Sequence, residues 1–296
     1  MTKRKKKSGL SQLILIALLV LLAAVAGVVI QILYQLPDIE ALNSYLPSES
    51  TLLFSNDGKI LARLHREENR QVVPLSKIAE YFQRAVIATE DPHFYYHHGL
   101  DFRGIIRASI KNFAYGRVVE GGSTITQQLA RNLFLTKRKT FARKLAEAIL
   151  ALQLERRYTK EELLELYLNQ VYLGHNAYGT ESAANLYFGK RASELGLAEA
   201  AMIGGLIRGP ELYSPYRNFQ EAKTRQIFVL NKMLEQGMIS ESEGKLAAAE
   251  KLEFSPKNLK RLGEIAPYFI SYVLQDLIDK YGEEMVYQGG LKVYTT

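Results

Sequence analysis

The feature that most constrains this chain is an apolar run close to its N-terminus. From Leu13 to Ile30 the eighteen residues include no charged or polar side chain, and after Gln31 three more apolar residues extend the run to Tyr34. A helix needs about 20 apolar residues to cross the hydrocarbon core of a bilayer. No face of the run is polar, so it does not suit an amphipathic helix on a soluble core. We therefore predict one N-terminal transmembrane helix, assigned to residues 10–36.

A basic head at residues 1–9 precedes the run and predicts its orientation. Lys and Arg side chains next to a membrane span stay in the cytoplasm, which places the bulk of the chain outside. A cleaved signal peptide is the alternative, because Ala24-Val25-Ala26 resembles a cleavage site. The apolar run continues past that site, which favours an uncleaved anchor. The expected location is the cytoplasmic membrane, single-pass, with the N-terminus inside.

Composition excludes several other classes of protein. Residues 3–7 supply five of the formal charges in a net +7, so +2 remains for the rest of the chain. A nucleic-acid-binding domain carries its basic excess on the folded part, so no nucleic-acid partner is expected. The chain has no cysteine. Disulfides, thiolate nucleophiles and cysteine-ligated metals are thereby excluded.

The remaining chain reads as mainly α with a small β-ribbon. A connector and ribbon occupy 37–75, where Asn56-Asp57-Gly58 marks a hairpin turn. Residues 76–252 form one helical domain, in which Thr or Ser followed by Glu or Gln three residues later marks helix starts. The predicted helices are 76–89, 102–115, 123–135, 139–157, 159–169, 180–188, 196–207, 218–236, 240–250 and 264–281. Residues 253–296 are expected to begin a linker, with a last strand that has no partner.

The densest group of titratable and aromatic side chains is Thr89–Gly99, which follows the first predicted helix. Pro92 is poorly tolerated inside a helix, so the helix should end near Glu90 and Asp91. A carboxylate beside aromatic rings loses part of its hydration, which suits a general acid or base. The alternative is that these carboxylates only cap the helix or form an ion pair.

A second group is Glu120–Asn132, which reads EGGSTITQQLARN. Two glycines lead into a helix whose free N–H groups and positive dipole end favour anions. Ser123, Thr124, Gln127 and Gln128 add hydrogen-bonding groups that suit sugars or phosphates. A simple capped helix is the alternative.

A third group is Arg143, Lys144 and Glu147. Arg143 and Glu147 lie on one helix face, so they could also form an ordinary surface pair. Apolar and basic residues at Leu133–Phe141 suit the interface of an anionic membrane, or else the edge of a soluble core. The histidines at 93, 97 and 98 lack the His-Glu-x-x-His spacing of zinc hydrolases, so no protein-bound metal is predicted.

Taken together and in this order, four motifs closely resemble glycosyltransferase family 51. They are Glu90-Asp91-x-x-Phe94-x-x-His97-x-Gly99, GGSTITQQLARN, Arg143-Lys144-x-x-Glu147 and Lys160–Asn169. This family is the peptidoglycan glycosyltransferase domain of class A penicillin-binding proteins and of monofunctional transglycosylases. A fifth motif, Leu197–Ile207 with Pro210, Tyr213 and Pro215, also fits. The departures are Arg131, where Lys is common, and Arg208, in a stretch that is usually less charged. Residues 266–296 resemble the linker before the transpeptidase domain of class A proteins.

The resemblance implies a lysozyme-like helical fold and an enzyme that polymerises lipid II into β-1,4-linked glycan. The reaction inverts the anomeric carbon and releases polyprenyl pyrophosphate. The resemblance also assigns Glu90 as the general base and Glu147 as the second catalytic glutamate, which organises the donor end. Expected substrate-binding residues are Asp91, Phe94, His97, Gly122, Ser123, Thr124, Gln127, Gln128, Arg131, Asn132, Arg143 and Lys144. Of these, Asp91 and His97 are interpreted as shaping the first motif rather than performing chemistry.

The resemblance leaves one cofactor open, a divalent cation (Mg or Mn) at the donor pyrophosphate. Expected partners are lipid II, the growing glycan chain, the bacterial cytoplasmic membrane and other cell-wall synthesis proteins. Two rival functions stay open. One is a lysozyme-like enzyme that cleaves glycan, and the other is a non-enzymatic anchored scaffold.

Overall fold

The structure is a computed structural model that describes residues 50–58, 60–64, 69–117, 121–135, 140–255 and 267–295, with scattered residues between 12 and 36. The predicted basic head at 1–9 and the first part of the connector, 37–49, lie outside the described residues. So does part of the predicted anchor. Among the residues described, no helix is both long and apolar enough to cross a membrane.

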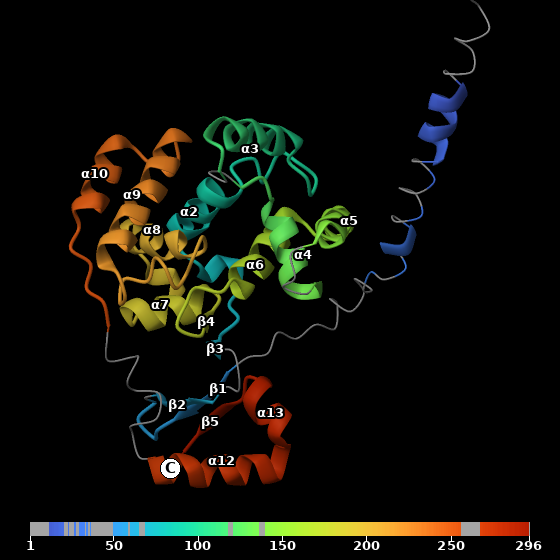
Figure 1. The fold of residues 1–296 in the computed structure, drawn as a ribbon. Coiled ribbons are helices and arrows are strands. Elements are labelled where there is room, and N and C mark those ends of the chain that lie inside the picture. Colours follow the sequence, from blue (N-terminus) through green and yellow to red (C-terminus); the bar gives the residue numbers. More distant parts are fainter. Residues whose placement is uncertain are drawn as a thin grey trace, which may run out of the picture.

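The described part of the chain is mainly helical, as predicted (Figure 1). The helices are α2 (Glu80–Glu90), α3 (Phe102–Tyr115), α4 (Ile125–Phe134), α5 (Phe141–Arg157), α6 (Lys160–Gln170), α7 (Thr180–Phe188), α8 (Leu197–Leu206), α9 (Phe219–Glu235), α10 (Glu241–Ala249), α12 (Pro267–Tyr281) and α13 (Glu283–Gln288). Two 3-10 turns are η2 (Leu75–Lys77) and η3 (Ala192–Glu194). The strands are β1 (Thr51–Phe54), β2 (Ile60–Leu64), β3 (Asn69–Arg70), β4 (Ala177–Tyr178) and β5 (Lys292–Tyr294).

Side-chain caps determine where several helices begin. The side chains of Thr124, Thr159 and Ser240 each accept a hydrogen bond from a backbone N–H in the first turn of the helix. In return, the backbone N–H of each of these residues donates to the side chain of the Gln or Glu three residues later. Asn218 likewise accepts a hydrogen bond from the first turn of α9. The helix predicted at 76–89 instead begins at Glu80, because the 3-10 turn η2 precedes it.

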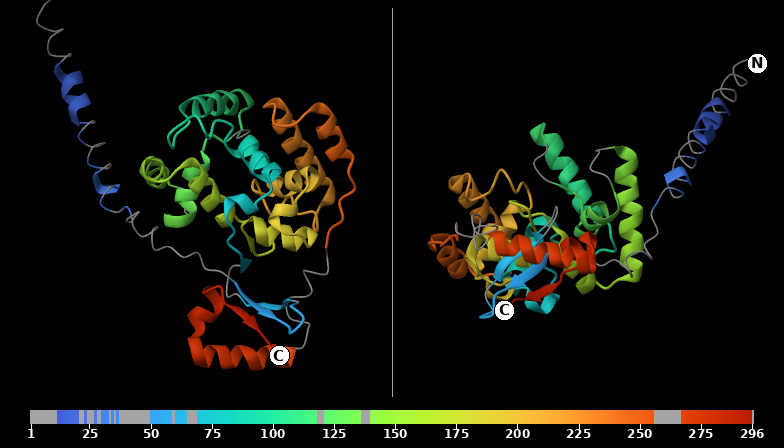
Figure 2. Two further views of the ribbon diagram at one scale, coloured as in Figure 1. Left: turned by 180° about the vertical axis from the view of Figure 1, so that it is seen from behind. Right: turned by 90° about the horizontal axis from the view of Figure 1, so that it is seen from below.

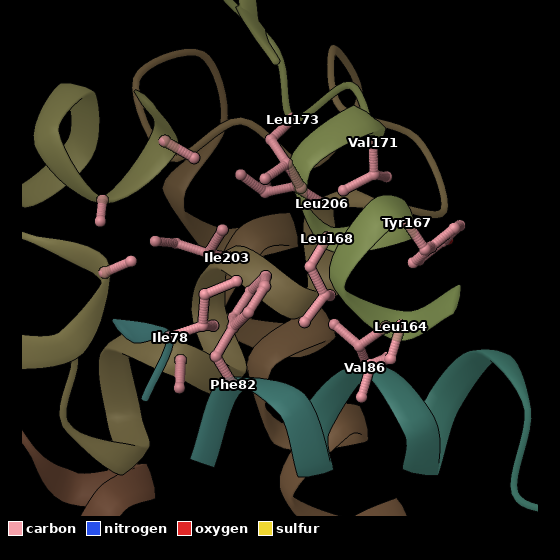
Figure 3. Close-up of a cluster of buried hydrophobic side chains, with 14 of the residues drawn as sticks. Ile78, Phe82, Val86, Leu164, Tyr167, Leu168, Val171, Leu173, Ile203 and Leu206 are labelled. Atoms are coloured by element: carbon pink, nitrogen blue, oxygen red, sulfur yellow. The ribbon is translucent and has the colours of Figure 1, made fainter. Parts of the chain in front are cut away.

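Helix α8 is the centre of the fold and is buried along almost its whole length. Its residues are apolar on nearly every face, which is typical of a helix surrounded by others. A Cβ built on Gly204 would lie 3.4 Å from Cβ of Ala85, so α8 and α2 approach closely. Around them, Phe82 of α2, Leu164 of α6 and Ile203 of α8 belong to the main core (Figure 3). This packing fixes the end of α2 relative to α6 and α8.

A small second unit joins the two ends of the described chain. Strand β1 pairs with β2 in antiparallel fashion and with β5 in parallel, with Leu53 opposite Val293. Leu277 of α12 and Val286 of α13 pack with Leu53 in a separate core. The predicted ribbon around residues 56–58 is confirmed. The prediction that the last strand has no partner is wrong, because its partner lies at the other end of the sequence.

Candidate active site

Helix α2 ends at Glu90, at the position that Pro92 predicts. Asp91 leaves helical geometry with φ −155°, and a turn follows. The half-buried Glu90 carboxylate accepts a hydrogen bond through Oε2 from Nε2 of Gln128, at 2.9 Å. The Tyr167 hydroxyl donates to Oε1 of the same Gln128, at 3.1 Å. Three helices, α2, α4 and α6, thus contribute to one chain of hydrogen bonds that ends on Glu90.

Tyr167 determines which way the Gln128 amide points. Burial raises the pKa of Tyr167 well above its usual range, and the Glu90 carboxylate adds to the rise. The protonated hydroxyl must donate, so the amide oxygen of Gln128 faces Tyr167 and its NH₂ group faces Glu90. Oε1 of Glu90 accepts no hydrogen bond from the described residues. That oxygen can therefore take up a proton from a bound substrate.

The first motif holds the start of α4 in place. Asp91 is buried and accepts a hydrogen bond from the Ile125 N–H at 2.9 Å. Nε2 of His97 lies 3.0 Å from both Asp91 carboxylate oxygens. The Thr124 hydroxyl donates to the Gly99 carbonyl at 2.7 Å. These bonds clamp the first turn of α4 against the end of α2, which brings Gln128 one turn later to Glu90.

Some predicted substrate contacts lie inside the fold. Phe94 is fully buried, with the Lys160 ammonium 4.5 Å from its ring centroid. Thr124 and Gln127 are buried, and their side chains are used in the cap of α4. In the structure these three side chains pack or cap within the fold, and their contact with a substrate stays a prediction. They support the site from behind because the helix cap and the core need them.

A cationic group lies beside the start of α4. Glu147 is charged yet only 1% exposed, and its two oxygens pair with Arg143 and, at 2.7 Å, with Lys144. Lys144 also donates to Oγ of Ser123 at 2.7 Å. An ordinary surface pair is thereby excluded. Two cations against one carboxylate leave a net positive charge next to Ser123, and Lys144 is exposed enough to reach an anion.

Comparison with known proteins identifies the family. Residues 57–234 match the family model described as Transglycosylase, which is more than half of the chain. The chain belongs to the transglycosylase family. The family predicted from the motifs is thereby confirmed.

The relatives of this chain are longer proteins. Penicillin-binding protein 1A of Neisseria lactamica is 43% identical over 262 residues, which cover 88% of this chain and 32% of that protein. The Aquifex aeolicus protein of the same name is 42% identical over 267 residues, covering 90% and 36%. The crystal structure of penicillin-binding protein 1A from Haemophilus influenzae matches with a TM-score of 0.50 and 25% identity, covering 85% of this chain and 27% of that one. The chain thus spans about a third of the length of these relatives.

The other predicted site residues of the chain lie along α4 and the segment before it. A Cβ on Gly122 would lie 3.1 Å from Cα of Ile105, so this segment rests against α3. Asn132 is exposed, and the charge of Arg131 acts on Tyr167. Leu133–Leu135 pack against the main core. These three residues are only partly buried and Phe141 is exposed, so contact of Leu133–Phe141 with the membrane interface stays a prediction. Residues 136–139 lie outside the described residues.

Motif reasoning overlooked Arg225 of α9, which also faces the site. Its guanidinium lies 4.3 Å from the Phe228 ring centroid, and its Nε donates to the Gly205 carbonyl at 3.3 Å. Burial lowers the pKa of Arg225, while the Glu90 carboxylate acts in the opposite direction. Gly205 makes room for it, since a Cβ there would lie 2.9 Å from Cγ of Arg225. A lone arginine in a long helix carries no local signal. Tyr167 lies in the recognised motif Lys160–Asn169, but the motif alone gives this residue no role.

Proposed function

We propose that this chain is a membrane-anchored peptidoglycan glycosyltransferase that polymerises lipid II into β-1,4-linked glycan. The observation that carries the proposal is the arrangement around the start of α4. Glu90 lies on one side, with one oxygen unpaired among the described residues, and Lys144 with Arg143 lies on the other. A base for a hydroxyl and cations for a phosphate leaving group are what this transfer needs. The motifs and the family membership support the same reaction.

In the proposed reaction the 4-hydroxyl of lipid II attacks the anomeric carbon of the lipid-linked glycan. The hydroxyl proton goes to Oε1 of Glu90, and the bond from the anomeric carbon to the pyrophosphate breaks. Direct displacement inverts the α-linked donor to a β-linkage and needs no covalent intermediate, as in inverting glycosidases. Polyprenyl pyrophosphate leaves with the bonding electrons.

Lys144 and Arg143 would neutralise the leaving pyrophosphate by charge-assisted hydrogen bonds. Glu147 would hold both cations in place. A divalent cation does not fit this set of residues, because both Glu147 oxygens already pair with cations. Mg²⁺ needs free carboxylate oxygens in addition to phosphates. No step is therefore assigned to a metal.

A lipid-linked substrate stays in the bilayer, so the enzyme must reach the membrane surface. The apolar run at residues 10–36 would anchor it, with the N-terminus inside and the catalytic domain outside. Helix α3 exposes a row of large apolar side chains at Phe102, Ile106, Ile110 and Phe113. It lies on the opposite side of the helical part from the small sheet unit (Figures 1 and 2). Exposed apolar surface of this extent suits contact with lipid.

The test is lipid II polymerisation in detergent by the chain and by its Glu90→Gln variant, with products resolved by length. We expect glycan polymer from the unchanged chain and a loss of about 10²-fold or more in the variant, the usual effect of removing a general base. Glu235→Gln, an exposed carboxylate on α9, is the control, and circular dichroism checks folding. Normal polymerisation by Glu90→Gln contradicts the assigned base. Cleavage of preformed glycan by the unchanged chain would instead support a hydrolase. The absence of both polymerisation and cleavage would support a scaffold.

A further inference from the structure

Helix α3 carries a row of basic side chains beside its exposed apolar row. Arg103, Arg107 and Lys111 each come one residue after a member of the apolar row, and no residue of α3 is acidic. Residues four apart lie on one face of a helix, and one step along the chain turns about 100° around it. The basic row therefore runs along one flank of the apolar row. Arg103 and Lys111 are exposed, and Arg107 is half-buried.

The basic row holds the basic excess of the chain outside the N-terminal head. Without residues 3–7 the net charge is +2, and three positive charges lie in α3, so everything else sums to −1. Asp101, which precedes α3, is already engaged. It accepts a hydrogen bond from the Gly104 N–H and lies 2.9 Å from Nδ1 of His93. The positive charge of α3 is therefore a local feature of this helix.

The packing of α3 turns both rows away from the protein. Its buried residues are Gly104 and Ala108, and Gly122 of the segment before α4 rests against Ile105 and Ala108. Each buried residue comes two steps after a member of the apolar row, which is about 200° around the helix. The apolar row thus faces outward at the edge of the helical part (Figure 1).

An apolar row with a basic flank is the pattern of a helix that lies in the interface of an anionic membrane. The apolar side chains enter the acyl boundary, while Arg and Lys extend their charged ends to the headgroups. A bilayer supplies both partners at once, whereas an acidic protein would have to present an apolar groove as well. The proposed lipid-linked substrate also requires this domain to lie on a bilayer.

We propose that the basic row of α3 binds the headgroups of anionic phospholipids and so docks the active site on the bilayer. The inference rests on the proposed function, because that function places the domain at a membrane. It goes beyond apolar contact, since a neutral bilayer would satisfy the apolar row but not the basic row. The partner is bulk phospholipid, because the cations proposed for the substrate pyrophosphate, Arg143 and Lys144, belong to α5.

The full chain with a fluorophore at Ala114→Cys tests the proposal, because this position is exposed and the chain has no cysteine. It is reconstituted in phosphatidylcholine vesicles with or without about one-third phosphatidylglycerol, and lipid-phase quenchers report how much of α3 is docked. We expect the anionic lipid to raise the docking equilibrium constant at least about five-fold, which corresponds to about 1 kcal/mol. Replacing Arg103, Arg107 and Lys111 together by Gln should abolish this difference.

The matched control replaces Arg217, Lys232 and Lys245 by Gln, which removes the same charge from surface ion pairs elsewhere. This variant should keep the dependence on anionic lipid, as should the charge-retaining variant Arg103→Lys/Arg107→Lys. Raising the salt from about 0.1 M to about 1 M shortens the Debye length from about 10 Å to about 3 Å and should weaken the dependence. Circular dichroism checks that each variant is folded.

Equal quenching of the unchanged chain in neutral and anionic vesicles overturns the proposal, as does an equal loss in the control variant. If neutral vesicles give the same increase once lipid II is added, α3 binds the substrate rather than bulk phospholipid, which also overturns it. The readout does not depend on turnover. Docking that requires anionic lipid supports the proposal even if the chain makes no glycan, a result that would refute only the proposed function.

Discussion

At the scale of single residues, Tyr167 shows how a buried group can orient the Gln128 amide that contacts Glu90, the proposed base. Tyr167→Phe removes the hydroxyl that orients Gln128. We expect kcat for polymerisation to fall several-fold, because the Gln128 amide can then turn away from Glu90. The unpaired amide oxygen should also cost about 1 kcal/mol in unfolding free energy. Polymerisation rates and thermal unfolding measure the two effects.

The matched control is Tyr187→Phe. Tyr187 is also buried, and its hydroxyl donates to a backbone carbonyl, that of Leu173, at 2.8 Å. The Tyr187→Phe variant should lose a similar amount of unfolding free energy without a change in kcat. Equal losses of kcat in both variants would show that Tyr167 acts only through stability.

His175 provides a prediction of pH dependence. Burial lowers the pKa of His175, so its neutral form is favoured in the folded state. An unfolded histidine has a pKa of about 6.5, so the unfolded chain binds more protons as the pH falls below that value. Stability from this group is present above about pH 6.5 and lost at lower pH. His175→Asn suits the positive φ of 48° and should reduce the fall in Tm between about pH 7.5 and about pH 5. An unchanged pH slope would contradict the prediction.

At the scale of elements, the tightest constraint lies at Gly99, between the first motif and α5. Its φ is +89°, and a Cβ there would lie 2.9 Å from the Ala151 carbonyl oxygen. Gly99→Ala should therefore cost more than the ~1–3 kcal/mol of a strained backbone alone. It should also disturb the start of α4, because the Gly99 carbonyl accepts the Thr124 hydroxyl. Chemical denaturation and polymerisation assays measure both losses.

Gly116→Ala separates strain from collision. Gly116 ends α3 with φ +62°, but no atom of the described residues lies within 4 Å of its would-be Cβ. This variant should lose only about 1 kcal/mol and keep its activity. A loss as large as that of Gly99→Ala would show that backbone conformation, not contact with α5, dominates at both sites.

At the scale of the whole molecule, the exposed row on α3 predicts how the protein sits on the membrane. The chain has no cysteine, so a single introduced thiol can carry a fluorophore. A label at Phe113→Cys should be quenched by lipid-phase quenchers when the full chain is in a bilayer. The control is Tyr272→Cys on α12, an exposed aromatic position in the small sheet unit. Equal quenching at both positions, or none at 113, would contradict a lipid contact by α3.

The sequence alone determined the features that depend on neighbours along the chain. The caps at Thr124, Thr159 and Ser240 start helices where predicted, because a side chain there reaches the N–H groups of the next turn. Pro92 predicts the end of α2. The family follows from motifs that are contiguous in the sequence.

Only the tertiary structure decided which groups meet. Tyr167 and Arg225 come from α6 and α9, and nothing local marks them as groups that act on the surroundings of Glu90. Strand β5 finds β1 at the opposite end of the sequence. The same packing buries Phe94 and leaves Glu147 only 1% exposed. Contacts between distant segments depend on how helices pack, and a local pattern of residues does not contain that information.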